Sequence, residues 1–213
     1  IKSLFASIIK QLTKIVNLLN AYYLQIYNTC YNKIERMGKM NTKFILVRHG
    51  EPRYDEVLER KYFGMGYDLG KLTEKGVMQA EKRAKDPIFK DAEIIVASPY
   101  TRALQTAAII SRITGIPLTV ENDLHEWMPD TTFKFELDAN NSFQEYLLAQ
   151  GIRKDHHIYH WESYPALKNR VEKALENYKS YKKVIVVCHG IVMSTLTRFD
   201  DVIEHCGVRE VTL

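Results

Sequence analysis

Apolar residues along this chain gather in short runs, and longer amphipathic segments separate these runs. Runs of this length predict buried strands, here at residues 44–47, 94–97, 118–120, 184–188 and 208–213. The run at 118–120 is short, as is typical of an edge strand. Segments with a 3.6-residue period predict helices at residues 73–87, 99–115, 142–150, 164–181 and 191–197. The alternation predicts an α/β fold, a three-layer α/β/α sandwich with a largely parallel central sheet.

Local signals define the ends of two of these helices. Thr73 followed by an acid is typical of a helix start. Ser98 is placed to cap the next helix, with Pro99 at its first position. Residues 51–72 are polar and interrupted by glycines, which predicts a long loop over the carboxyl end of the first strand. The chain ends on its last predicted strand, and one reading of this end is a truncated C-terminus.

Residues 1–36 form a separate segment with a 3.6-residue period and neither proline nor glycine. They predict an N-terminal amphipathic helical extension, followed by a domain at residues 37–213. Polar residues interrupt its uncharged stretch, which argues against a membrane-spanning helix, and no cleavage pattern indicates a secretion signal. Three readings remain open: contact with an anionic membrane surface, pairing with a partner helix, or non-native upstream sequence. The last rests on Met37 and Met40, which closely precede the first strand.

Composition and charge narrow the class of protein. With 213 residues, 46% of them hydrophobic, the chain can bury one sizeable core. Residues 1–36 hold five basic residues and one acidic residue, which account for the net charge of +4. The remaining 25 basic and 25 acidic residues balance, so we expect no nucleic-acid partner. The sequence gives no indication of an oligomeric state.

The three cysteines, Cys30, Cys188 and Cys206, show no metal-ligand spacing, and their odd number argues against a disulfide framework. We therefore expect a reducing, cytoplasmic location, with membrane association only through residues 1–36.

Candidate chemistry lies at the ends of three predicted strands. Arg48 and His49 follow the first strand, Arg102 lies shortly after the second, and His189 follows the run at 184–188. The carboxyl ends of parallel strands meet at one edge of a sheet, where ligands bind. Two arginines and two histidines there would suit a tetrahedral dianion, because guanidinium groups match phosphoryl oxygens bidentately.

A second cluster, which we call the three-histidine loop, comprises His156, His157 and His160. It has no cysteine or carboxylate in the spacing of a known metal site. We interpret it as a solvated loop and expect no metal.

Five motifs in order along the chain resemble those of the histidine phosphatase superfamily, the phosphoglycerate mutase-like family. The resemblance extends from about Lys43 to the C-terminus. It rests on Arg48-His49-Gly50-Glu51, Leu72-Thr73-Glu74-Lys75-Gly76 with Gln79-Ala80, Ser98-Pro99-Tyr100-Thr101-Arg102-Ala103-Leu104-Gln105-Thr106-Ala107, Leu124-His125-Glu126 and His189-Gly190. The resemblance implies a phosphoglycerate mutase-like fold, a small phosphorylated substrate and no cofactor.

The resemblance also implies the roles of the site residues. His49 would be the nucleophile, forming a phosphohistidine by in-line attack. Arg48, Arg102 and His189 would bind the phosphoryl oxygens and offset charge in the transition state. Two residues just beyond the first motif are further candidates for substrate binding, Arg53 and Tyr54.

Glu126 would protonate the leaving oxygen and then activate water. A carboxyl group with that task needs a raised pKa, and its apolar neighbours Leu124 and Trp127 are placed to supply it. Glu51 and Asp123 are nearby alternatives for the same role.

Departures from the family pattern bear on the substrate. Pro52 and Asp55 stand where many relatives carry serine or threonine and then asparagine. The charge of Asp55 would repel a phosphate, so we expect that loop to turn differently. Residues 127–130 replace the Gly-x-Trp-Glu-Gly-like stretch of the mutases, which favours a metal-independent phosphomonoester hydrolase. A mutase-type phosphotransferase and a phospho-ligand binding or scaffold protein with little turnover are the alternatives.

Overall fold

Five strands pair into one sheet in the order β3-β2-β4-β1-β5. The computed structural model describes residues 41–135 and 138–213. The strands are β1 (Lys43–Arg48), β2 (Ile94–Ala97), β3 (Leu118–Val120), β4 (Lys183–Cys188) and β5 (Val208–Thr212). β1 to β4 are parallel, and β5 runs antiparallel along β1 at one edge. The predicted largely parallel sheet is therefore confirmed, with β3 at the other edge as its short run indicates.

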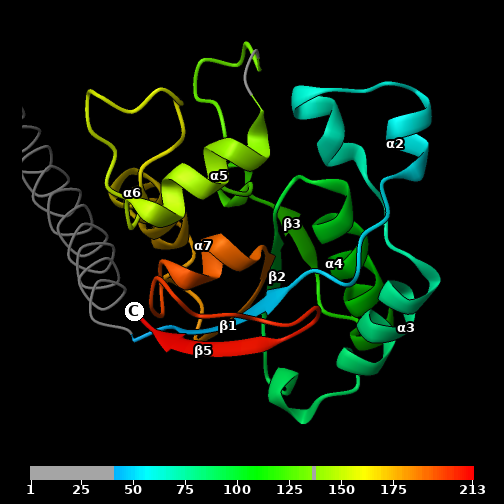
Figure 1. The fold of residues 1–213 in the computed structure, drawn as a ribbon. Coiled ribbons are helices and arrows are strands. Elements are labelled where there is room, and N and C mark those ends of the chain that lie inside the picture. Colours follow the sequence, from blue (N-terminus) through cyan, green and yellow to red (C-terminus); the bar gives the residue numbers. More distant parts are fainter. Residues whose placement is uncertain (1–40, 136–137) are drawn as a thin grey trace, which may run out of the picture. The chain divides into compact units, whose positions relative to one another are not determined.

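Helices cover both faces of this sheet (Figure 1). The α-helices are α2 (Asp55–Glu59), α3 (Glu74–Arg83), α4 (Thr101–Thr114), α5 (Ala139–Leu148), α6 (Tyr164–Glu176) and α7 (Gly190–Ser194). Three short 3₁₀ helices complete the described elements: η1 (Gly64–Leu69), η2 (Pro87–Phe89) and η3 (Asn122–Leu124). One core cluster joins the sheet to α5, α6 and α7, and a second joins its other face to α4. These two cores confirm the three-layer α/β/α fold.

Strand β1 shows why the sheet is buried on both sides. Phe44 and Leu46 belong to the core beneath α6 and α7, whereas Ile45 and Val47 belong to the core beneath α4. None of the four is exposed. Successive side chains of a strand point to opposite faces, so an uninterrupted apolar run is what a strand covered by two helical layers needs.

Several expectations about local structure are wrong in detail. The predicted long loop at residues 51–72 contains two short helices, α2 and η1. The helix predicted at 99–115 begins at Thr101, because Ser98 does not cap it. The helices predicted at 73–87, 164–181 and 191–197 end earlier than expected, at Arg83, Glu176 and Ser194. The apolar period alone does not mark the residue at which an element begins or ends.

Two glycines let the chain after β1 approach the start of α3. A Cβ on Gly50 would lie 2.5 Å from the Gly76 carbonyl oxygen, and a Cβ on Gly76 would lie 2.3 Å from the Glu51 carbonyl oxygen. Both distances are shorter than any tolerated contact, so only glycine allows this approach. The contact holds the backbone that follows His49 against α3.

The predicted N-terminal amphipathic helix at residues 1–36 lies outside the described residues, as does the domain boundary at Met37. The membrane-surface and partner-helix readings concern that same segment. Within residues 41–135 and 138–213, no helix is both long enough and apolar enough to cross a bilayer.

Candidate active site

The carboxyl ends of β1, β2 and β4 lie side by side, because β4 pairs with both other strands. His49, Ser98 and His189 are the residues that directly follow these three strands. The rings of His49 and His189 lie edge to face with their centroids 5.2 Å apart. The topology therefore brings together two histidines that are 140 residues apart in the chain.

His49 is buried, with 4% of its surface exposed. Its Nδ1 lies 2.7 Å from the Gly50 carbonyl oxygen. Because a carbonyl oxygen can only accept, Nδ1 carries the proton and Nε2 keeps its lone pair. The pKa of His49 is lowered to about 3, mainly by burial and also by the cations of Arg102 and Arg48, against the opposing hydrogen bond to Gly50. The imidazole is therefore neutral at physiological pH, with Nε2 available as a nucleophile.

His189 is fully buried, and its hydrogen bond involves Nε2, whereas that of His49 involves Nδ1. Its Nε2 lies 2.7 Å from the Ser98 hydroxyl, which accepts a hydrogen bond from the Tyr100 backbone N–H at 3.3 Å. The hydroxyl can donate its own proton to Nε2, and in that tautomer the His189 proton lies on Nδ1. Burial keeps the pKa of His189 well below its ordinary value. Ser98, expected to cap a helix, instead orients a predicted site histidine.

Two buried donors of this site are unpaired. Among the described residues, neither His189 Nδ1 nor Arg48 Nε has a hydrogen-bond partner. The Arg48 guanidinium lies over Gly190, where an added Cβ would be 3.6 Å from Nε, and its Nη1 donates to the Ile203 carbonyl. An unpaired buried donor costs free energy, and two such donors beside His49 indicate a place for an anionic ligand.

Arg102, only 6% exposed, lies in the first turn of α4. Its Nη1 donates to Asp68 Oδ1 at 2.9 Å, and its guanidinium carbon lies 5.2 Å from the centre of the Tyr100 ring. Burial raises the pKa of Asp68, and the charge of Arg102 opposes that rise. Sequence reasoning missed Asp68, because η1 lies in a segment where no pattern marks it.

Glu126 has the environment expected of an acid. Its Oε1 accepts a hydrogen bond from the Trp127 backbone N–H at 2.9 Å. Burial raises the pKa of Glu126, while that hydrogen bond and the charges of Arg102 and Arg48 act in the opposite direction. The expected direction of the pKa shift is therefore present.

The two alternatives to Glu126 have different surroundings. Glu51 binds Lys75 Nζ at 2.6 Å and Thr73 Oγ1 at 3.1 Å, and the hydrogen bond from Lys75 lowers the pKa of Glu51. Asp123 is exposed to solvent. Of the three carboxyl groups, only Glu126 combines a raised pKa with the influence of both site arginines.

The two further substrate-binding candidates lie in different settings. Arg53 is exposed, and its Nε donates to Asp55 Oδ1 at 2.7 Å, so its guanidinium is paired with a surface carboxylate. The expected repulsion by Asp55 is offset by this ion pair. The Tyr54 ring stacks on Tyr67 with centroids 4.5 Å apart, and burial raises the pKa of Tyr54 while Arg102 opposes the rise. Tyr54 therefore lies within the electrostatic reach of the site.

In the three-histidine loop, two side chains have other partners. His157 Nδ1 accepts from the Lys154 backbone N–H at 2.9 Å, and His160 Nδ1 lies 2.9 Å from an Arg153 guanidinium nitrogen. Within the part of the chain that the structure describes, no group of three or more histidine, cysteine or acidic side chains is arranged to hold a metal.

Comparisons with known proteins agree with the resemblance drawn from the motifs. Residues 44–199 match the family model described as the histidine phosphatase superfamily (branch 1). A protein of Hydrogenobacter thermophilus, provisionally named phosphoserine phosphatase 2, is 30% identical over 154 residues, which are 70% of this chain and 73% of that protein.

Solved structures share the fold. A mycobacterial glucosyl-3-phosphoglycerate phosphatase is similar with a TM-score of 0.60 at 18% identity, covering 81% of this chain and 90% of that one. YhfR of Bacillus stearothermophilus is similar with a TM-score of 0.58 at 23% identity, covering 79% and 90%.

Proposed function

Because this chain belongs to the histidine phosphatase superfamily, branch 1, we propose that it hydrolyses phosphomonoesters through a phosphohistidine at His49. The observation that carries the proposal is the hydrogen bond from His49 Nδ1 to the Gly50 carbonyl, 2.7 Å long, which leaves Nε2 unprotonated. A neutral imidazole with a free lone pair is a competent nucleophile toward phosphorus.

In the first step, His49 Nε2 attacks the phosphorus and the bond to the ester oxygen breaks. The phosphoryl oxygens accept hydrogen bonds from Arg48, Arg102 and His189. The donor of His189 is its Nδ1–H. Phosphoryl transfer depends mainly on positioning and charge stabilisation, and donors held in a buried site need little reorganisation. The two unpaired donors, Arg48 Nε and His189 Nδ1, gain partners in this state.

Arg102 must share its charge with a second anion when substrate binds. Its Nη1 already donates to Asp68, in a pair whose side chains are 7% and 23% exposed. A phosphoryl dianion that takes this donor competes with Asp68. The carboxylate on η1 therefore opposes substrate binding at the same guanidinium.

Glu126 supplies the proton that leaves with the ester oxygen. Its raised pKa favours the protonated form before the step, as a general acid requires. In the second step the Glu126 carboxylate accepts a proton from water, whose oxygen attacks the phosphohistidine. The nitrogen–phosphorus bond breaks, its electron pair returns to His49 Nε2, and inorganic phosphate leaves.

The substrate class is a small phosphomonoester. Phosphoserine is the first compound to assay, because the 30% identical relative carries the name of a phosphoserine phosphatase.

Trp127 is buried, and its indole nitrogen donates to the Glu162 carbonyl at 2.7 Å. The 127–130 stretch that departs from the mutase pattern thus packs inward at its first residue.

The test compares His49→Ala with the matched variant His156→Ala, which removes an exposed histidine of the three-histidine loop. We expect His49→Ala to abolish phosphate release from 4-nitrophenyl phosphate and acid-labile labelling of the protein by a ³²P substrate, whereas His156→Ala keeps both. Undiminished turnover in His49→Ala would refute the mechanism. A phosphorylated isomer in place of inorganic phosphate would identify a mutase.

A further inference from the structure

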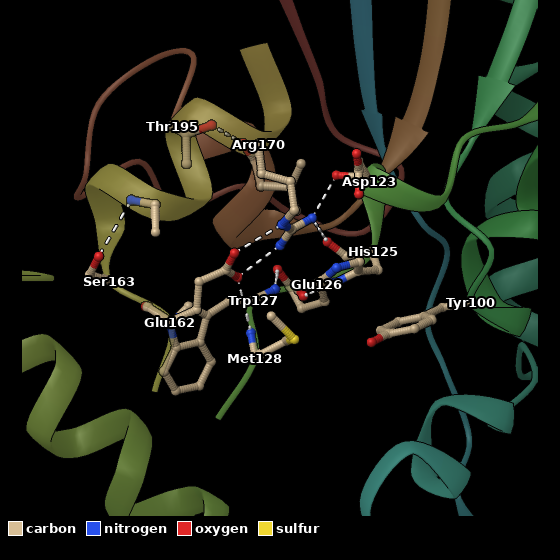
Figure 2. Close-up of polar contacts among 12 residues, drawn as sticks. Tyr100, Asp123, His125, Glu126, Trp127, Met128, Glu162, Ser163, Arg170 and Thr195 are labelled. Carbon is tan, nitrogen blue, oxygen red and sulfur yellow. Dashed lines mark hydrogen bonds and ion pairs between the residues drawn. The ribbon is translucent and has the colours of Figure 1, made fainter. Parts of the chain in front are cut away.

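Glu126 lies in a short stretch, residues 125–128, that belongs to no helix or strand. A carboxyl group that protonates a leaving oxygen must hold its position closely, since a displacement of 1 Å can cost about 100-fold in rate. An irregular segment supplies no such rigidity by itself. The groups that hold residues 125–128 in place come from α6 and from the residues just before that helix (Figure 2).

Arg170 of α6 donates to the backbone that immediately precedes Glu126. Its Nη1 lies 2.6 Å from the Asp123 carbonyl oxygen and 3.1 Å from the His125 carbonyl oxygen. The Arg170 side chain is 13% exposed. A single guanidinium thus binds two carbonyl groups of the segment that leads into Glu126.

Glu162 binds the Arg170 guanidinium and also the backbone that follows Glu126. Its carboxylate accepts from Arg170 Nε at 2.9 Å and from Nη2 at 2.8 Å, and it accepts from the Met128 backbone N–H at 3.4 Å. Its backbone adds two more bonds: its N–H donates to the Met128 carbonyl at 2.9 Å, and its carbonyl accepts from Trp127 Nε1 at 2.7 Å. The Arg170–Glu162 pair therefore makes hydrogen bonds to the chain both before and after Glu126.

We propose that the buried Arg170–Glu162 ion pair is a positioning device for Glu126. The proposal rests on the proposed function, in which Glu126 protonates the leaving oxygen. Neither member of the pair is assigned a contact with the reacting atoms, so both are positioning residues. The device acts through the backbone of residues 123–128 and sets where the Glu126 carboxyl group lies.

Stability alone is a poor account of this pair. A buried ion pair is often no more stabilising than well-packed apolar side chains of similar volume. Apolar side chains, however, cannot donate to the carbonyl groups of Asp123 and His125, nor accept from the N–H of Met128. The hydrogen bonds that the pair makes to the backbone end on η3 and on the irregular stretch after it, which carries the proposed acid.

The experiment uses two substrates of nearly the same shape, phenyl phosphate and 4-nitrophenyl phosphate. Phenolate is the more basic leaving group, so its departure depends more on a well-placed acid. We expect Arg170→Met to lower kcat/KM, which reports the step in which the leaving group departs, about 30-fold on phenyl phosphate and less than about 3-fold on 4-nitrophenyl phosphate. Glu126→Gln should show the same selective loss, and the double variant of Glu126 and Arg170 should lose no more than Glu126→Gln alone.

Two controls separate positioning from folding. Arg170→Met leaves the Glu162 carboxylate buried without its cation, which destabilises a fold. The variant Arg170→Met/Glu162→Gln removes both charges, keeps an acceptor for the Met128 N–H, and should show the same selectivity. Lys168→Met removes an exposed cation from the same helix, where it pairs with Glu172 at 3.8 Å, and should keep the wild-type ratio.

Each outcome decides the proposal. Selective loss in both Arg170 variants, with thermal unfolding well above the assay temperature, supports it. Equal loss on the two substrates overturns it and leaves the proposed function standing, provided that Glu126→Gln is selective. If Glu126→Gln is not selective, the assignment of the acid fails and the positioning role fails with it.

Discussion

Acidification should destabilise this protein through His49, and the structure sets the size of the effect. The folded-state pKa of about 3 lies below the ordinary value of 6.5, because the imidazole is buried and faces two cations. Between these values the unfolded chain binds a proton that the folded protein does not. The free energy of unfolding is therefore unaffected above about pH 6.5, falls as the pH drops below it, and stops falling near pH 3.

The magnitude follows from linkage. Each pH unit between the two pKa values corresponds to about 1.4 kcal/mol, so the full effect of His49 is about 5 kcal/mol. Between pH 7 and pH 5 its share is about 2 kcal/mol. That is a large part of the 5–15 kcal/mol by which domains are typically stable.

The assay is urea unfolding at pH 7 and pH 5, in buffers free of phosphate, for wild type and His49→Gln. We expect the wild type to lose about 2 kcal/mol more than the variant between the two pH values. His156→Gln, an exposed histidine, serves as the control and should behave as the wild type. Contributions from other groups, such as His189, are present in every protein and largely cancel in the difference.

Equal losses in wild type and His49→Gln would show that His49 is not held neutral by burial. A second measurement tests directly whether His49 is neutral. Nitrogen-15 NMR of the wild type should show a neutral His49 with its proton on Nδ1 from pH 5 to pH 8, as the hydrogen bond to Gly50 requires. A proton on Nε2 would remove the basis for nucleophilic attack.

Three further predictions test other parts of the site. Asp68→Asn should tighten inhibition by inorganic phosphate about fivefold, because the Asp68 carboxylate no longer competes for Arg102; weaker inhibition would mean that Asp68 orients Arg102. Gly76→Ala should lower the free energy of unfolding by about 1–3 kcal/mol, since the new methyl group would lie 2.3 Å from the Glu51 carbonyl oxygen; thermal melting measures this, and an unchanged melting temperature contradicts it. EDTA should leave phosphatase activity unchanged, and a loss that a divalent metal restores would favour metal binding at the three-histidine loop.

Much of the fold follows from local pattern. The run at 44–47 is apolar at every position, and the strand β1 that contains it is covered on both faces. Thr73 caps α3 as its position indicates, with its hydroxyl accepting from the Gly76 N–H at 2.9 Å. Periods and caps depend on neighbours in sequence, which is why such features can be inferred without a structure.

Where the local pattern did not predict a residue's role, that residue interacts with a partner distant in the sequence. Ser98 has the residue type and the position of a helix cap, yet its hydroxyl binds His189, 91 residues away. Asp68 lies in a segment without periodicity and finds Arg102 across 34 residues. The pairing of Arg170 with Glu162 matters because both reach the backbone around Glu126, and no spacing in the sequence announces that contact.

The sequence by itself determined the five strands, the longer helices and which side chains stand at the ends of strands, because these depend on the period and length of apolar runs. It also carried the motifs that identify the superfamily. Only the tertiary structure decided that β4 lies between β1 and β2, and this places His49, His189 and Ser98 at one edge. The pKa shifts of His49 and Glu126 were decided there too, because they depend on burial and on charges that distant segments bring together.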